Sequence, residues 1–251
     1  LTCQTHPRFT EEFGPFAERA RSAACPAANA LLLGNREPLG FREVETGEPG
    51  EEGDEWLPYL VPFRQRLFTV LQDRSRPLRA RLAEFLTLCL LGDAVLADAE
   101  REGTAPEGLL TLEGGTLEGE LPEEGIFPAG FRLLASLDVL EPDWRDVLAR
   151  AGTAAPVPQD EALLERIAVY FAYRSILKCV NDGDLLGRAL YTVFLTLAAE
   201  RIAAVCGLPE ALRRLSREVE HDADNGEALL TAFREDAAFD LGCFLRELRD
   251  P

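Results

Sequence analysis

The densest group of titratable side chains in this sequence is Glu220-His221-Asp222. A histidine flanked by carboxylates can act as a general base or bind a metal ion, because its imidazole changes charge near neutral pH. The alternative is a structural or solvated histidine, since His221 has no partner four residues further along its helix. Glu220 and His221 are therefore candidate catalytic residues.

A second group, Tyr170, Tyr173 and Arg174, falls on consecutive turns of a predicted helix. Two phenols and a guanidinium can bind a carboxylate or stack on a flat ligand. The two tyrosines therefore join the candidate catalytic residues. The alternative is aromatic core packing, with Arg174 paired to a buried acid such as Asp182 or Asp184.

Asp182 and Asp184 flank Gly183 in a short polar turn. Two carboxylates this close suggest a cation site, but they lack the regular ligand spacing of an EF-hand loop. Helix capping by Asp184 is the favoured interpretation. Together with Arg174 and Arg217, these two aspartates are the candidate substrate-binding residues.

These groups lie on or beside a predicted helical hairpin that spans Glu165–Arg201. Apolar side chains recur at helical spacing in its first half, and its second half is apolar almost all round. Gly183 can end the first helix in the left-handed conformation. We therefore expect the hairpin at the centre of the fold, where it would position the candidate residues.

The rest of the chain shows helical periodicity and no convincing strand pattern. Loops rich in glycine and proline are expected at residues 34–54 and 101–125, and short connections elsewhere favour antiparallel neighbours. The predicted fold is all-α, a multi-helix orthogonal or antiparallel bundle around the central hairpin. The other predicted helices are one within Phe13–Leu33, Trp56–Leu71, Leu78–Glu100, Phe131–Leu140, Asp143–Arg150, one after Pro209, and Glu227–Leu248.

The composition is that of a soluble globular protein, with 47% hydrophobic and 28% charged residues in a chain of 251. The net charge of −18 disfavours nucleic acid as a partner and suits a lysine-bearing protein, or simply maintains solubility. No apolar run reaches the ~18 residues of a membrane span, and no signal peptide is recognisable. We expect a cytoplasmic protein that does not enter a membrane.

The six cysteines are scattered, and no two form a Cys-x-x-Cys pair. Four of them lie in apolar helical patterns, where cysteine behaves as a small buried hydrophobe. Cys3 and Cys25 differ, because both lie beside prolines near the start of the chain. The chain contains no methionine and opens on Leu1-Thr-Cys, so we expect an N-terminal region to be missing.

Three blocks of the sequence form a pattern along the chain. The first is Thr2-Cys-Gln-Thr-His-Pro-Arg-Phe, followed by Ala24-Cys-Pro-Ala-Ala. The second is Leu71-Gln-Asp-Arg-Ser-Arg-Pro-Leu-Arg-Ala-Arg-Leu. The third joins Tyr170-Phe-Ala-Tyr-Arg, Asp182-Gly-Asp-Leu-Leu-Gly-Arg and Ser216-Arg-Glu-Val-Glu-His. In this order and spacing the blocks resemble the flagellin lysine-N-methylase family over nearly the whole chain.

The resemblance implies a bacterial enzyme that methylates lysine side chains of flagellin or a similar protein with S-adenosylmethionine. It also implies an iron–sulfur cluster in a cysteine-rich N-terminal segment, with Cys3 and Cys25 as candidate metal ligands. The sequence departs from the family there, because the cysteine-dense region is lacking and His6 replaces a tyrosine. No Rossmann-type glycine loop is present, so the methyl donor would need a helical site of another kind.

The domain organisation that follows has residues 1–40 as a remnant of the cysteine-containing segment and residues 55–251 as a helical domain, or both as one continuous domain. A competing hypothesis is a non-catalytic helical module that binds a protein. In that case the chemistry would lie in the missing N-terminal segment or in a partner.

Overall fold

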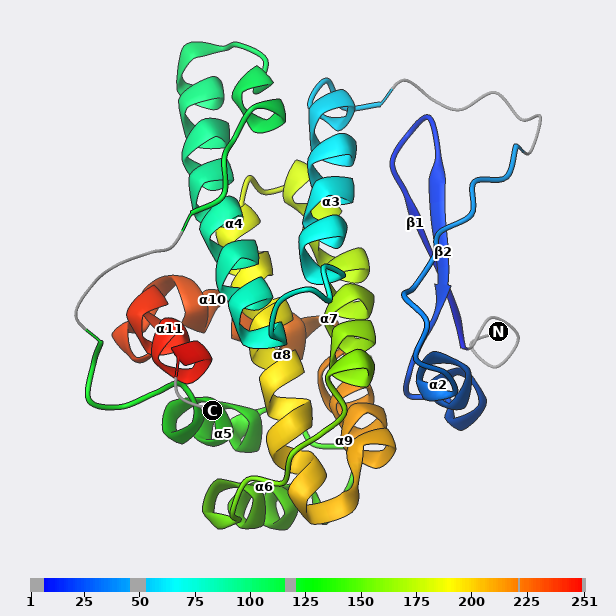
Figure 1. Ribbon diagram of the computed structural model, residues 1–251, viewed down its shortest axis with the longest axis vertical. Helices are drawn as coiled ribbons and strands as arrows, with labels where there is room; N and C mark the ends of the chain where they lie inside the picture. Colours follow the sequence, from blue (N-terminus) through cyan, green and yellow to red (C-terminus); the bar gives the residue numbers. More distant parts are fainter. Residues whose placement is uncertain (1–6, 46–52, 116–120, 221, 250–251) are drawn as a thin grey trace.

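The computed structural model describes residues 7–45, 53–115, 121–220 and 222–249. Their regular structure is helical, apart from one small antiparallel hairpin near the N-terminus (Figure 1). The elements in chain order are β1 (Arg8–Glu12), β2 (Ala17–Arg21), α2 (Pro26–Leu33), α3 (Leu57–Leu71), α4 (Leu78–Glu102), η1 (Glu107–Leu110), α5 (Phe127–Ser136), α6 (Trp144–Thr153), α7 (Glu161–Ser175), η2 (Ile176–Val180), α8 (Leu185–Cys206), α9 (Leu208–Leu215), η3 (Ser216–Glu220), α10 (Ala223–Glu235), η4 (Ala237–Phe239) and α11 (Leu241–Arg249). The prediction of an all-α fold is confirmed.

The predicted central hairpin is present as α7, η2 and α8. Asp160 caps α7 by accepting a hydrogen bond from the backbone N–H of Ala162. Gly183 takes a left-handed φ of 70° in the turn, and Asp184 caps α8 by accepting the N–H of Gly187 at 2.9 Å. The local signals in the turn are thus sufficient to end one helix and begin the next.

Helix α8 is apolar all round because other helices cover it. It packs against α4, α6, α7, α9 and α10. Its length and hydropathy alone would allow it to cross a membrane, but 67% of its most apolar window is buried inside the protein. Helix α8 is therefore a core helix of this fold, as its central position in Figure 1 illustrates.

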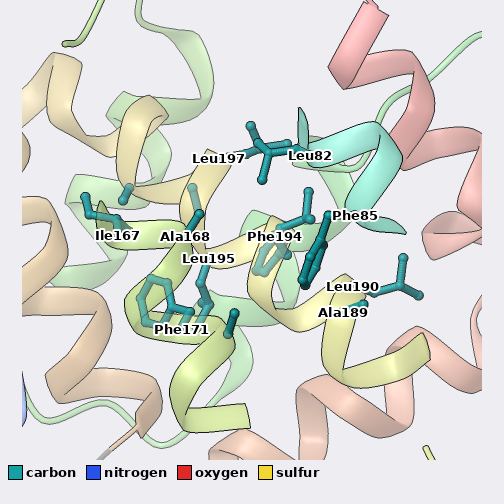
Figure 2. Packing of buried hydrophobic residues seen from close by; sticks show 14 of the residues in the cluster. Leu82, Phe85, Ile167, Ala168, Phe171, Ala189, Leu190, Phe194, Leu195 and Leu197 are labelled. Atoms are coloured by element: carbon teal, nitrogen blue, oxygen red, sulfur yellow. The ribbon is translucent and has the colours of Figure 1, made fainter. Parts of the chain in front are cut away.

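The core forms where α4 and α7 meet α8. Figure 2 shows Leu82 and Phe85 of α4 reaching towards Phe194 and Leu197 of α8, all almost completely buried. Phe171 of α7 is also fully buried, on another side of α8. These are the apolar positions that helical periodicity predicts.

The N-terminal strands correct the sequence-based prediction, which had no strand there. The helix predicted within Phe13–Leu33 is present as α2, with Pro26 in its first turn and Gly34 at its end. Strand β2 occupies Ala17–Arg21, and the helix begins only at Pro26. Gly14 has a φ of 75° in the connecting turn, and the N–H of Ser22 donates to the carbonyl of Pro7 at 2.7 Å. Tertiary pairing thus overrides the helical propensity of an alanine- and arginine-rich segment.

The C-terminal region also differs from its prediction, because Glu227–Leu248 is not one helix. Asp236 ends α10 and caps the short η4 by accepting the N–H of Ala238 at 2.9 Å. Helix α11 then begins at Leu241. No proline or glycine lies between Glu235 and Asp240, and the apolar periodicity continues across the break. The sequence therefore gives no sign that the helix ends there.

Candidate functional site

Three candidate residues meet where α7 faces η3. The hydroxyl of Tyr170 donates to Glu220 Oε2 at 3.0 Å, and Arg174 Nη1 lies 2.6 Å from Glu220 Oε1. Arg174 Nη1 also donates to the Tyr170 oxygen at 3.0 Å. The sequence placed Tyr170 and Arg174 one helical turn apart, but it paired Arg174 with Asp182 or Asp184, and that pairing is wrong.

Glu220 reaches this position because α9 continues into η3, a π-helical turn. Ser216 Oγ donates to Glu220 Oε2 at 2.6 Å across this turn. Two residues earlier, Glu218 turns the other way and accepts the N–H groups of Leu140 and Glu141. A π-turn rotates successive side chains away from α-helical spacing, a feature frequently found at functional sites.

The N-terminal segment covers the Tyr170–Arg174–Glu220 cluster. The backbone N–H of Ala23 donates to the Tyr170 oxygen at 3.0 Å, and the Phe9 ring lies 4.0 Å from the Arg174 guanidinium carbon. Tyr170 is consequently 6% exposed. The carboxylate of Glu220 is satisfied from within the protein, by a phenol, a hydroxyl and a guanidinium.

Burial changes the acidity of the groups around Glu220. Burial, assisted by the negative charge of Glu220, raises the pKa of Tyr170 to about 12. The same two causes raise the pKa of Tyr191 on α8 still further. Burial would lower the pKa of Arg174, but the charge of Glu220 and the interactions with Tyr170 together outweigh it and raise that pKa. Both phenols therefore stay protonated and the Arg174 guanidinium stays charged near neutral pH.

The raised pKa of Tyr170 predicts that the protein loses stability at alkaline pH. Between about pH 10 and about pH 12, an unfolded phenol has lost its proton whereas Tyr170 keeps it. The unfolded state then binds fewer protons, so the free energy of unfolding falls by about 1.4 kcal/mol per pH unit for this group. Urea unfolding over that range measures the slope, and Tyr170→Phe should reduce it. An unchanged slope in the variant would contradict the assignment.

Tyr173 lies apart from this cluster, so the structure does not bring it together with the candidate catalytic residues Tyr170 and Glu220. Its ring stacks on Phe41 with centroids 4.8 Å apart, and the Arg64 guanidinium lies 5.3 Å from its centroid. Burial, together with the charge of Glu18, raises the pKa of its hydroxyl. Tyr173 belongs to the packing between α7, α3 and the N-terminal segment.

The other predicted substrate-binding residues have structural partners. Asp182 pairs with Arg188, whose Nε donates to Asp182 Oδ1 at 3.3 Å. Asp184 caps α8 and lies 3.1 Å from Arg234 Nη1. Neither aspartate joins the Tyr170–Glu220 cluster, so the capping interpretation describes Asp184 correctly.

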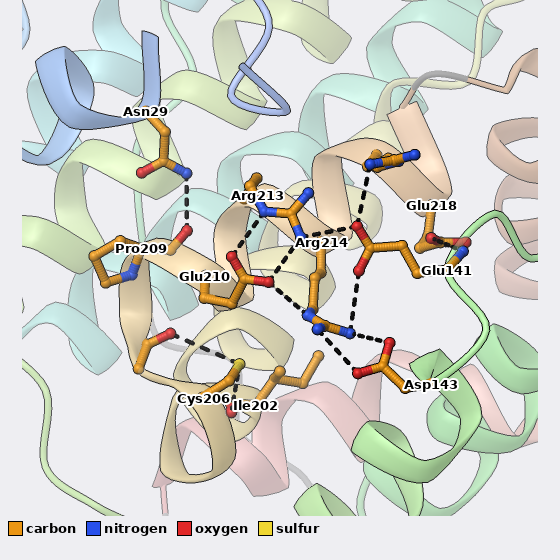
Figure 3. Close-up of polar contacts among 12 residues, drawn as sticks. Asn29, Glu141, Asp143, Ile202, Cys206, Pro209, Glu210, Arg213, Arg214 and Glu218 are labelled. Carbon is orange, nitrogen blue, oxygen red and sulfur yellow. Dashed lines mark hydrogen bonds and ion pairs between the residues drawn. The ribbon is translucent and has the colours of Figure 1, made fainter. Parts of the chain in front are cut away.

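Arg217 lies on the far side of η3 in a surface ion network. Its Nη1 is 3.3 Å from Glu141 Oε1. Figure 3 shows the same network continuing through Arg213 and Arg214 to Glu210. These pairs connect α9 to the segment before α6 and leave Arg217 away from the cluster.

The predicted metal ligands do not form a site in the described part of the chain. Cys25 is a free thiol at the N-cap of α2, while Cys3 and His221 lie outside the described residues. Among the described residues, no group of three histidine, cysteine or acidic side chains could hold a metal ion. The residues described here therefore do not fit an iron–sulfur cluster.

Two surface hollows lie away from the cluster. One, of about 680 Å³, is bordered by α10 and η4, including Glu227 and Glu235. The other, of about 520 Å³, lies between the β1–β2 turn and the start of α3, and Phe16 and Leu57 line it. Neither is lined by Tyr170, Arg174 or Glu220.

Comparisons with family models, curated proteins and solved structures find no match to this chain. The cluster must therefore be interpreted from its own geometry. Sequence reasoning found three of its members but missed Tyr191 and the role of Ser216. The four-residue spacing of Ser216 and Glu220 was a usable signal, whereas Tyr191 lies in a helix that is apolar throughout.

Proposed function

We propose that this chain is the helical part of a protein-lysine N-methyltransferase that acts on flagellin or a similar lysine-bearing protein, with S-adenosylmethionine as methyl donor. The observation that carries the proposal is the contact between the first and third of the blocks that resemble the flagellin lysine-N-methylase family. Phe9 of the first block contacts Arg174 of the third, and Tyr170 and Ser216 both contact Glu220.

The cluster suits the handling of a lysine side chain. A lysine ammonium must lose its proton before its nitrogen can accept a methyl group. Glu220 is the carboxylate that can take that proton, and Tyr170 and Arg174 hold it in place through the contacts already described. The aromatic rings of Phe9 and Tyr170 would face the methylene chain of the lysine and exclude water from it.

The residues as they stand leave no room for the methyl donor at the cluster. The side chain of Glu220 is 4% exposed and that of Arg174 is 15% exposed. We therefore assign to the cluster the binding and deprotonation of lysine and no step that involves the donor. A cytoplasmic location is part of the proposal.

The proposal is tested by mass spectrometry of flagellin after incubation with the anaerobically prepared full chain and the methyl donor. Glu220→Gln keeps the size of the side chain but removes the base, so methylation should fall by about 10²–10⁴-fold. The matched control is Glu210→Gln, which removes a carboxylate from the ion network on α9. Equal activity of the two variants would contradict the role of Glu220.

A non-catalytic binding module is the second candidate function. It is favoured by the closed, internally satisfied cluster and by the largely apolar hollow between the β1–β2 turn and α3. Flagellin that binds at a defined stoichiometry but is never methylated, with or without Glu220→Gln, would support the binding module over the enzyme.

A further inference from the structure

We propose that the β1–β2 hairpin, Arg8–Arg21, is an ionically latched lid that opens to admit a lysine side chain to the Tyr170–Arg174–Glu220 cluster. The lid deepens the proposed function and depends on it for what is admitted. Its opening is a property of this chain that can be measured without flagellin or the methyl donor.

The face of the hairpin that docks on the helices is unusually polar. Burial alternates along both strands, and the inward side chains are Phe9, Glu11, Glu18 and Ala20. Glu11 and Glu18 lie directly opposite each other in the strand register. Two carboxylates at such a cross-strand pair repel each other unless cations compensate them.

Cations on the helical body supply this compensation. Lys178 of η2 lies 2.6 Å from Glu11, and Arg64 Nη1 of α3 donates to Glu18 at 2.8 Å. The Lys178–Glu11 pair is about one-third exposed on both sides, whereas the Arg64–Glu18 pair is nearly buried. Two ion pairs thus hold the hairpin on the helices. Its Phe9 ring covers the Arg174 guanidinium of the cluster.

The apolar support of the hairpin is confined largely to its turn, where Phe13 is buried and Phe16 stacks on it. In Figure 1 it lies beside the helical bundle rather than within it. Its turn leaves the hollow of about 520 Å³ against α3, bordered by Pro15 and Val61. A two-stranded hairpin is marginally stable alone in water. Once undocked, with Glu11 and Glu18 uncompensated, it should lose its ordered ladder.

The segment that follows the hairpin remains anchored when the lid opens. Helix α2 packs on α7 and α9. Asn29 Nδ2 on α2 donates to the carbonyl of Pro209 at 2.9 Å, a contact visible in Figure 3. The N–H of Ala23 is bound to Tyr170. Ser22 is also anchored, since its hydroxyl lies 3.2 Å from that of Ser216. The hinge therefore lies between Arg21 and Ser22.

Hydrogen exchange measured by mass spectrometry tests the lid. In the unaltered protein, the amides of residues 8–21 should exchange faster than those of α8, and higher salt should accelerate them because it screens the exposed Lys178–Glu11 pair. Lys178→Glu should accelerate them by about three- to tenfold and leave α8 unchanged. The matched control is Arg101→Glu, which reverses the charge of an exposed pair with Asp98 on α4.

Phe9→Ala provides a second variant, because it removes the ring over Arg174 without changing charge. It should also accelerate exchange of the hairpin, with a weaker dependence on salt than Lys178→Glu. The lid is overturned if residues 8–21 exchange only as slowly as α8, or if Lys178→Glu behaves like Arg101→Glu. If the hairpin opens but flagellin is not methylated, the proposed function is contradicted and the lid is supported. If flagellin is methylated but the hairpin does not open, the lid is contradicted and the proposed function is supported.

Discussion

Replacing Glu165 with alanine should destabilise the protein by about 3–5 kcal/mol, because the change removes the buried counter-ion of Arg81 and leaves it the more exposed Glu161 at 3.5 Å. Glu165 is fully buried and accepts hydrogen bonds from Arg74 at 2.9 and 2.8 Å and from Arg81 at 2.8 Å. Arg81 is itself 2% exposed and donates to the carbonyl of Leu71 at 2.6 Å. Without Glu165, two positive charges face each other across the junction of α3, α4 and α7.

Urea unfolding followed by circular dichroism measures this loss. Asp98→Ala is the matched control, since it removes an exposed partner of Arg101 and should change the free energy of unfolding by less than about 1 kcal/mol. The double variant Glu165→Leu with Arg81→Met should recover much of the stability, because apolar side chains of similar size avoid the cost of burying charge. Equal stability of Glu165→Ala and Asp98→Ala would refute the argument.

Phe194→Ala should cost about 3–5 kcal/mol, because it leaves a cavity at the centre of the fold. Phe194 of α8 is fully buried. Its ring contacts Phe233 edge-on at 5.4 Å and Phe239 at 6.4 Å. The cavity would therefore open where α8 meets α10 and η4, and few side chains there are free to collapse into it.

Gly130 provides an independent test of the same packing. A Cβ added there would lie 2.3 Å from Phe194 Cε2, so Gly130→Ala should destabilise by about 1–3 kcal/mol through overpacking. Combining Gly130→Ala with Phe194→Leu should lower the free energy of unfolding by less than the sum of the two single changes. The smaller side chain at position 194 leaves room for the added methyl group, and that methyl group fills part of the cavity. Additive effects would show that α5 does not press on this ring.

The residues of the candidate site were only partly predictable. Helical spacing correctly placed Tyr170 and Arg174 on one side of α7. It could not exclude Tyr173, because residues three apart share a helix face only approximately and the neighbouring elements decide which group each one meets. The partner of Arg174 was unpredictable for the same reason. It comes from η3, where a π-turn departs from the periodicity that sequence reasoning assumes.

The block Leu71–Leu82 illustrates a pattern whose role only became apparent in the fold. Its repeated arginines suggested part of a family motif, yet Arg74 and Arg81 neutralise the buried Glu165. A charged residue within a helix is normally expected at the surface. Because Glu165 and its partners are distant in the sequence, no local pattern shows that they share a buried site.

The sequence by itself determined the all-α class, the central hairpin and its turn, since these depend on apolar periodicity and on local capping by Gly183 and Asp184. Only the tertiary structure decided that Arg8–Arg21 pairs as strands and that Glu220 meets Tyr170 and Arg174. The physical reason is that periodicity and capping act over a few residues. The β1–β2 hairpin and the Tyr170–Arg174–Glu220 cluster depend on long-range pairs such as Glu11 with Lys178. Such pairs stabilise the fold only once distant segments are in contact.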